Sequence, residues 1–141
     1  MTVTAKGRYA LRMMLDIAAQ PEGSPVSLRD VSARQEISMK YMEQVAAQLV
    51  RAGLLKSVRG AQGGYLLAKL PRACTAGDVL RAAEGKLGAS AEREAPGESA
   101  AARAAASFWE GFDRAVDAYA DGVSLKDMLD AQSERGYDYS I

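Results

Sequence analysis

Side chains able to contact nucleic acid are concentrated in two segments of the first half of the sequence. Lys40, Glu43 and Gln44 lie close together, and ammonium, carboxylate and amide groups pair with the edges of DNA bases. Arg59 precedes a glycine-rich segment, residues 60–64, whose backbone could approach a duplex closely. The first 72 residues carry 11 Lys and Arg against 5 Asp and Glu, a net of +6, and the rest carries 7 against 13, a net of −6. This asymmetry predicts that the first half meets a polyanion.

The content of cysteine and histidine excludes several kinds of chemistry. The chain has 141 residues, with 1 Cys and no His. One copy therefore cannot form a Ser-His-Asp triad, a Cys-His zinc site or a four-cysteine iron–sulfur cluster. The length suits one domain with its own core, and no apolar stretch approaches the ~20 residues of a membrane span. We expect a cytoplasmic protein that is not an enzyme, holds no cofactor or metal and contacts no membrane.

Capping and turn signals predict the elements that carry the polar side chains. Ser27 and Ser38 are typical N-caps, and apolar residues recur at helical spacing after each of them. Two short apolar stretches flank the glycine-rich segment and predict a β-hairpin. The predicted elements are helices over residues 5–19, 28–35 and 39–52 and strands over residues 54–58 and 65–68. This order predicts a mainly α fold with a small β-hairpin wing, a winged helix-turn-helix domain over residues 1–72.

The second half predicts helices around a long loop. An aromatic-bearing stripe that includes Trp109 runs along the longest of these helices. We expect a region of linker loop and helices over residues 73–132 and a C-terminal tail over residues 133–141. Its parts are a short helix ending before Gly85, a mobile loop over residues 85–99, a long helix over residues 100–120 and a final helix to residue 132.

The helix over residues 39–52 is the predicted reading helix. Met42, Val45 and Leu49 are expected to face inward, which turns the polar side chains toward solvent or a DNA major groove. Arginine beside glycine suits a narrow minor groove, and the start of a helix favours a phosphate. A module that contacts proteins rather than DNA would show the same polar face, and that alternative stays open. The predicted DNA-binding residues are Lys6, Arg8, Ser38, Lys40, Tyr41, Glu43, Gln44 and Arg59.

Three ordered segments closely resemble the Rrf2 family of bacterial regulators. They are KGRYAL at residues 6–11, the segment from Ile37 to Gln44, and the segment from Gly53 to Tyr65. The resemblance implies a homodimer that reads a pseudo-palindromic operator in double-stranded DNA. It also implies that the long helix is a dimerisation helix. The interface residues implied in this way are Phe108, Trp109, Phe112, Val116 and Tyr119.

The resemblance also bears on cofactors. Iron–sulfur members of the family carry three cysteines before the tryptophan, but residues 84–107 contain no cysteine and no histidine. Arg103 stands where one cysteine is expected, and Ala106 stands at the position of a histidine. The chain therefore resembles the cluster-free branch typified by CymR, a repressor of cysteine metabolism.

In that branch the implied corepressor is cysteine synthase, an enzyme that accepts a terminal isoleucine in its active site. The segment formed by Asp138, Tyr139, Ser140 and Ile141 predicts docking of that enzyme, and a frayed tail is the alternative. A second alternative is a regulator that senses a small ligand or a redox state through the dimer half or Cys74. Cys74 precedes a predicted helix start, which can lower a thiol pKa, but free cysteine also packs as a small apolar residue.

Overall fold

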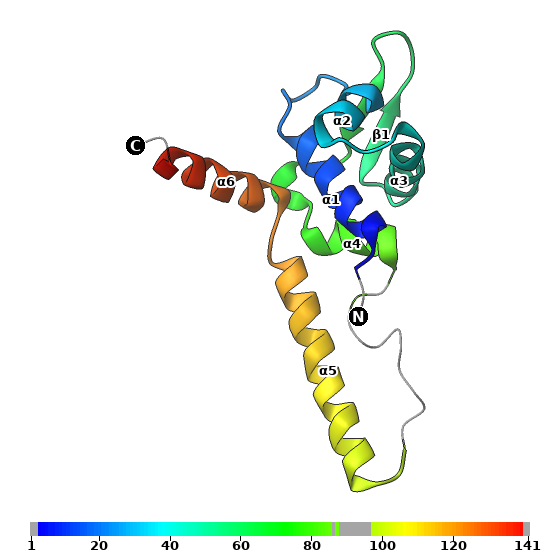
Figure 1. Cartoon of the computed structure of the whole chain (residues 1–141), viewed down its shortest axis with the longest axis vertical. Coiled ribbons are helices and arrows are strands. Elements are labelled where there is room, and N and C mark those ends of the chain that lie inside the picture. The colour runs from blue at the N-terminus through cyan, green and yellow to red at the C-terminus, as the bar shows by residue number, and fades with distance from the viewer. Residues whose placement is uncertain (1–2, 86, 88–96, 140–141) are drawn as a thin grey trace.

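A computed structural model describes residues 3–85, 87 and 97–139 (Figure 1). The fold is mainly helical with one two-stranded antiparallel sheet in the described part, as predicted. The elements in chain order are α1 (Ala5–Ala18), α2 (Leu28–Gln35), α3 (Met39–Arg51), β1 (Leu55–Val58), β2 (Gly64–Leu67), the 3-10 helix η1 (Pro71–Ala73), α4 (Ala76–Glu84), α5 (Ala100–Asp121) and α6 (Leu125–Tyr139). Within these described ranges, every helix is too short or too polar to cross a membrane.

One hydrophobic core lies among α1, α2, α3 and α4. Met13 and Met14 of α1 are fully buried, as are Met42 and Leu49 of α3. The inward-facing residues predicted for the reading helix are confirmed, because α3 buries Met42, Val45, Ala46 and Leu49. Burying a side chain of this size contributes about 1.5–3 kcal/mol. The polar face of α3 is therefore fixed by what its apolar face contacts.

The hairpin is attached to the helices by a backbone bridge. The register places Leu55 opposite Leu67 and Val58 opposite Gly64. Val26 and Tyr65 exchange two backbone hydrogen bonds of 2.9 Å. A Cβ at Gly64 would lie 2.3 Å from the carbonyl oxygen of Val26, so only glycine permits this close approach. The wing is thereby held beside the segment that leads into α2.

The turn between α2 and α3 has a defined geometry. Glu36 caps α2 with a left-handed backbone at φ 56°, a conformation uncommon for residues other than glycine. The hydroxyl of Ser32 donates to the carbonyl of Ile37 across this turn. Ser38 then caps α3 by accepting a hydrogen bond from the N–H of Tyr41 at 3.3 Å. The predicted N-cap at Ser38 is confirmed.

The second half differs from the expectation at its end. The final helix was predicted to stop near residue 132, but α6 continues to Tyr139. Glu134 and Arg135 are compatible with a helix, and the cost of about 1 kcal/mol for a helical glycine does not end it at Gly136. The predicted loop over residues 85–99 falls largely on residues 86 and 88–96, which lie outside the described part.

Candidate nucleic-acid interface

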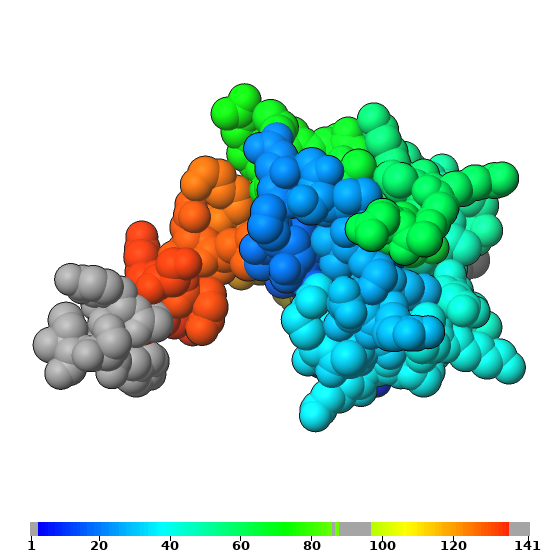
Figure 2. Space-filling model, turned by 90° about the horizontal axis from the view of Figure 1, so that it is seen from above, coloured from blue at the N-terminus to red at the C-terminus, as the bar shows by residue number. Residues whose placement is uncertain are grey.

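The predicted reading helix and the wing lie on one side of the domain. In two perpendicular views, α3 and the hairpin are on the side opposite α6 (Figures 1 and 2). Arg59 directly follows β1, where the chain enters the wing tip, and its side chain is exposed. The exposed members of the predicted set are Lys6, Arg8, Ser38, Lys40, Glu43, Gln44 and Arg59.

Tyr41 differs from the other members of the predicted set because it is half-buried. Its ring meets the ring of Tyr9 edge to face, with centroids 5.2 Å apart and planes at 85°. The guanidinium of Arg12 lies 5.7 Å from the centroid of Tyr9 on the same helix. Edge-to-face pairs of this kind contribute about 0.5–1.5 kcal/mol beyond their buried area. Tyr41 therefore helps to hold α3 against α1.

A cavity of about 300 Å³ joins the start of α1 to the polar face of α3. Lys6 lines it together with Tyr41 and Gln44, so three predicted residues come together there. Gln48 and Arg51 line the same cavity, although the predicted set omits them. Their positions four and seven residues after Gln44 place them on one helical face, which is the signal that could have included them. Two cationic side chains, those of Lys6 and Arg51, therefore line the same cavity.

An ion pair between the exposed Arg34 and the buried Asp16 connects α1 to α2. Arg34 donates to both carboxylate oxygens of Asp16, at 3.0 and 2.7 Å, and the amide of Gln35 donates to Asp16 at 2.8 Å. Burial alone would raise the pKa of Asp16, but the hydrogen bonds from Arg34 and Gln35 and the charge of Arg34 outweigh it. The pKa of Asp16 is therefore lowered from its ordinary value of 3.8. This pair fixes α2, and with it the turn that leads into α3.

Glu84 holds the start of α1, a role that no local sequence signal indicates. Its carboxylate accepts hydrogen bonds from the N–H groups of Thr4 at 3.1 Å and Gly7 at 2.7 Å. A Cβ at Gly7 would lie 3.0 Å from the side chain of Glu84, so glycine allows the contact. Burial would raise the pKa of Glu84, but the hydrogen bonds from Thr4 and Gly7 and the charge of Lys6 lower it overall. The start of α1, where Lys6 lies, is thereby fixed.

The predicted interface residues form an uncovered apolar face on α5. Phe108 is 62% exposed, Trp109 45% and Tyr119 77%. The ring of Trp109 meets those of Phe108 and Phe112 edge to face, with centroids 5.0 and 5.4 Å apart. Phe112 and Val116 are half-buried and line an apolar cavity of about 370 Å³. Contiguous exposed apolar patches are typical of protein, membrane or ligand contacts.

Known proteins resemble this chain over most of its length. Residues 3–131 match the family model Rrf2, described as an iron-dependent transcriptional regulator. The transcriptional regulator IscR of Aliivibrio salmonicida is 36% identical over 92% of this chain and 77% of its own length. The structure of CymR, the global cysteine regulator of B. subtilis, has a TM-score of 0.81 at 34% identity, covering 93% of this chain and 98% of that one. The structure of T. potens IscR has a TM-score of 0.78 at 38% identity, covering 99% and 96%.

The family description corrects one prediction. We expected a protein without a cofactor, but the family is described as iron-dependent, and relatives carry the name IscR. The expectation of no cofactor is therefore wrong for the family to which the match points. That expectation rested on the scarcity of thiolate and imidazole ligands in one chain, which has 1 Cys and no His.

The donors in this chain do not fit a cluster held by several thiolates. Its single cysteine, Cys74, is 1% exposed and packs in the core. Burial and the nearby charge of Asp78 raise the pKa of Cys74 to about 11, so the thiol stays protonated at neutral pH. Among the described residues, no three Cys, His, Asp or Glu are grouped so as to hold a metal ion.

The match to the family model covers most of the chain, and the relative from Aliivibrio exceeds 30% identity over nine-tenths of it. The fold agrees with solved structures of the same family at similar identity. In a helix-turn-helix fold the second helix lies in the major groove, and the polar face of α3, which follows α2 across a short turn, is exposed. The chain therefore belongs to the Rrf2 family of DNA-binding transcriptional regulators.

Proposed function

We propose that this chain acts in the cytoplasm as a homodimeric repressor that places α3 in the major groove and Arg59 in the minor groove of its operator. The observation that carries the proposal is the position of α3 and the wing on one side of the domain (Figures 1 and 2). A single duplex can then meet both elements at once. The bent or narrowed minor groove next to a reading helix has the negative potential that attracts arginine.

The exposed side chains suit distinct parts of a duplex. Gln44 can pair with an adenine through two hydrogen bonds, and Glu43 can accept from a cytosine amine. Lys40 suits guanine or a phosphate. Lys6, Arg8 and Ser38 suit phosphates, which position a protein on DNA without reading its sequence. Tyr41 is half-buried against Tyr9, so we assign only its hydroxyl edge to the duplex.

A second copy of the chain is the proposed cover for the apolar face of α5. The three most exposed aromatic residues of that helix are Phe108, Trp109 and Tyr119, and burying them against a partner would be favourable. Pairing the same face of two copies gives a two-fold interface, and a two-fold protein matches a pseudo-palindromic operator.

The test of DNA reading begins with duplexes selected from a random pool by the unaltered protein. Arg59→Ala should then weaken binding by about 1–3 kcal/mol and relax the sequence preference at the minor-groove position. Arg135→Ala is the matched control, because this exposed arginine lies on α6, on the opposite side of the domain. The logarithm of the affinity should fall steeply with the logarithm of salt, by ~0.9 for each phosphate contact. Equal losses for the two variants, or binding insensitive to salt, would contradict the proposal.

Genes of cysteine or sulfur metabolism are the proposed targets. The support is the likeness to CymR over nearly the whole of both chains. The structure of T. potens IscR is equally similar to this chain, so the sequence of the selected operator must decide the gene class. The alternative of a redox sensor at Cys74 has little support, because that thiol is buried and protonated. A small ligand in the dimer half stays the other alternative.

Docking of cysteine synthase on the C-terminal segment stays a prediction. Ser140 and Ile141 lie outside the described residues, and only the backbone of Asp138 and Tyr139 is described, within α6. The test adds purified cysteine synthase to the operator complex of the full chain and of a chain lacking Ile141. We expect the enzyme to raise operator affinity only for the full chain and O-acetylserine to cancel the gain. Identical responses of the two chains would contradict the prediction.

A further inference from the structure

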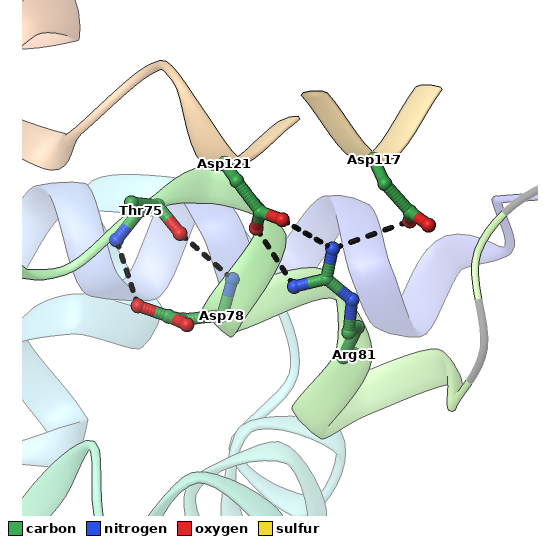
Figure 3. A network of polar contacts seen from close by, with 5 residues as sticks. All are labelled: Thr75, Asp78, Arg81, Asp117 and Asp121. Atoms are coloured by element: carbon green, nitrogen blue, oxygen red, sulfur yellow. Dashed lines mark hydrogen bonds and ion pairs between the residues drawn. The ribbon is translucent and has the colours of Figure 1, made fainter. Parts of the chain in front are cut away.

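Arg81 of α4 holds the C-terminal end of α5 through two carboxylates (Figure 3). Its Nη1 donates to Oδ1 of Asp121 at 2.8 Å, and its Nη2 donates to Oδ2 of the same residue at 2.9 Å. Nη2 also donates to Oδ1 of Asp117 at 3.2 Å. Asp117 and Asp121 are one turn apart, so one guanidinium spans a full turn of α5. A planar, bidentate contact fixes the direction of a helix as well as its distance. These three residues are called the clamp below.

Gly77 provides the space that the clamp occupies. A Cβ at this position would lie 2.1 Å from Oδ1 of Asp121 and 3.0 Å from Nη1 of Arg81. Any other residue would displace the carboxylate from the guanidinium. An aspartate side chain can rotate away, so Gly77→Ala is expected to open the clamp without disturbing the backbone of α4.

The backbone supplies a pivot next to the clamp. The N–H of Ala76 donates to the carbonyl of Val123 at 2.8 Å, and the N–H of Leu125 donates to the carbonyl of Cys74 at 2.9 Å. These bonds pin the turn between α5 and α6 to the start of α4. The pivot alone would allow α5 to tilt relative to α4. The clamp adds a polar contact between the two helices, up to one turn further along α5. The clamp carboxylates are about half exposed, at 49% and 48%, so the pair contributes little to folding itself.

Beyond the clamp, a cavity interrupts the packing of α5 against α4. The apolar cavity of about 370 Å³ is lined by Leu80 of α4 and by Phe112 and Val116 of α5. Phe108 lies about 20 Å along the helix from Asp121 at the usual rise per residue. A tilt of about 10° at the pivot therefore moves Phe108 by about 3.5 Å, close to the length of one base-pair step.

We propose that the clamp formed by Arg81, Asp117 and Asp121 sets the angle between α5 and the winged half, which consists of α1 to α4 with the hairpin. The clamp thereby sets the spacing of the two operator half-sites that the dimer accepts. This inference rests on the proposed DNA-binding dimer. In that dimer the paired α5 helices connect the two winged halves. The angle at each clamp therefore changes the distance between the two α3 helices. The clamp residues are positioning residues, since none of them is assigned to the DNA.

The test uses duplexes that carry two copies of the selected half-site at the natural separation and at separations one base pair shorter and longer. The unaltered protein should prefer the natural separation by about tenfold. Arg81→Gln and Gly77→Ala should reduce that preference to about twofold while a single half-site is bound as well as before. Arg135→Gln, which removes the same charge from α6, should keep the full preference. Thermal unfolding of each variant confirms that it is folded.

The outcomes separate the inference from the function on which it rests. If the unaltered protein does not bind paired half-sites, the proposed dimeric function fails. If it binds them without preference for separation, or if the clamp variants lose affinity equally at every separation, the clamp does not set the spacing. Gly77→Ala provides a second route should Arg81→Gln fail to fold, because it opens the clamp while Arg81, Asp117 and Asp121 all keep their charges.

Discussion

The helices α3 and α5 bury their residues very differently. Of the 13 residues of α3, four are buried against the rest of the winged half. Of the 22 residues of α5, all of which are described, only Ala120 is buried. Both helices have an apolar stripe, but the stripe of α3 is covered within one chain and that of α5 is not. The stripe of α3 belongs to a core that is completed within one chain, whereas α5 keeps an exposed apolar face that the second copy in the proposed dimer would cover.

The largest effect is expected from truncating the buried stripe of α3. Leu49→Ala should lower the free energy of unfolding by about 3 kcal/mol, because Leu49 is fully buried and its removal leaves a cavity. Chemical denaturation measures the change. Phe108→Ala on α5 is the matched control. Because Phe108 belongs to the proposed interface, the comparison is made at concentrations where the protein is monomeric, and there its effect on unfolding should be under about 0.5 kcal/mol. Equal losses would show that the two helices are not as different as their burial indicates.

The next effect is expected at the proposed interface. Trp109→Ala should weaken the dimer by about 2 kcal/mol, because a large aromatic residue at the centre of an interface often dominates its energy. Sedimentation equilibrium of the variant and of the unaltered protein measures the monomer–dimer constant. A matched substitution on the exposed face of α6, Gln132→Ala, should leave it unchanged. If the unaltered protein is monomeric, or if Trp109→Ala leaves the dimer as stable as before, the proposed interface on α5 is contradicted.

A comparable effect is expected from the ion pair that fixes α2. Arg34→Ala leaves the buried Asp16 with Gln35 alone and should cost about 2 kcal/mol of stability at neutral pH. The folded pKa of Asp16 is below 3.8, so its contribution is complete above about pH 3.8 and is lost as the pH falls through the folded pKa. Urea unfolding between pH 7 and 2.5 should therefore show that the free energy of unfolding decreases less in Asp16→Asn than in the unaltered protein. An identical decrease in the two proteins would mean that the ion pair does not contribute to the pH dependence of stability.

The smallest effect compares two N-caps. Ser27 caps α2 by accepting from the N–H of Asp30 at 3.1 Å, and Ser99 caps α5 by accepting from the N–H of Ala102 at the same distance. Ser27→Ala should lower the unfolding free energy of the winged half by about 1 kcal/mol. Ser99→Ala should leave that free energy unchanged, since the start of α5 lies far from the winged half (Figure 1). Thermal unfolding followed by circular dichroism resolves a difference of this size.

Local signals predicted the winged half well. The buried face of α3, the cap at Ser38 and the hairpin around Arg59 all depend on residues within a few positions of one another. Such spacing is visible in a sequence because helix and strand periods are short. Most side chains of the predicted interface are accordingly exposed, and Tyr41 is half-buried because its contact with Tyr9 comes from another helix.

Long-range contacts and the chain end were not predictable in the same way. Glu84 holds Thr4 across 80 positions, and Arg81 meets Asp121 across 40. No periodicity links residues so far apart, and only the folded chain brings them together. The continuation of α6 to Tyr139 was missed because polar residues around Gly136 gave no apolar stripe. The iron dependence named in the family description was not expected, because the prediction counted only the ligands that one chain offers.

The most direct test of the central claim, that paired winged halves read DNA through α3 and Arg59, is a hydroxyl-radical footprint on the selected operator. The account predicts two protected stretches of equal length, related by two-fold symmetry and centred about one helical turn or a multiple of it apart. Each stretch should include a protected minor groove that becomes accessible in Arg59→Ala. A single asymmetric stretch, or protection that Arg59→Ala leaves intact, would contradict the account.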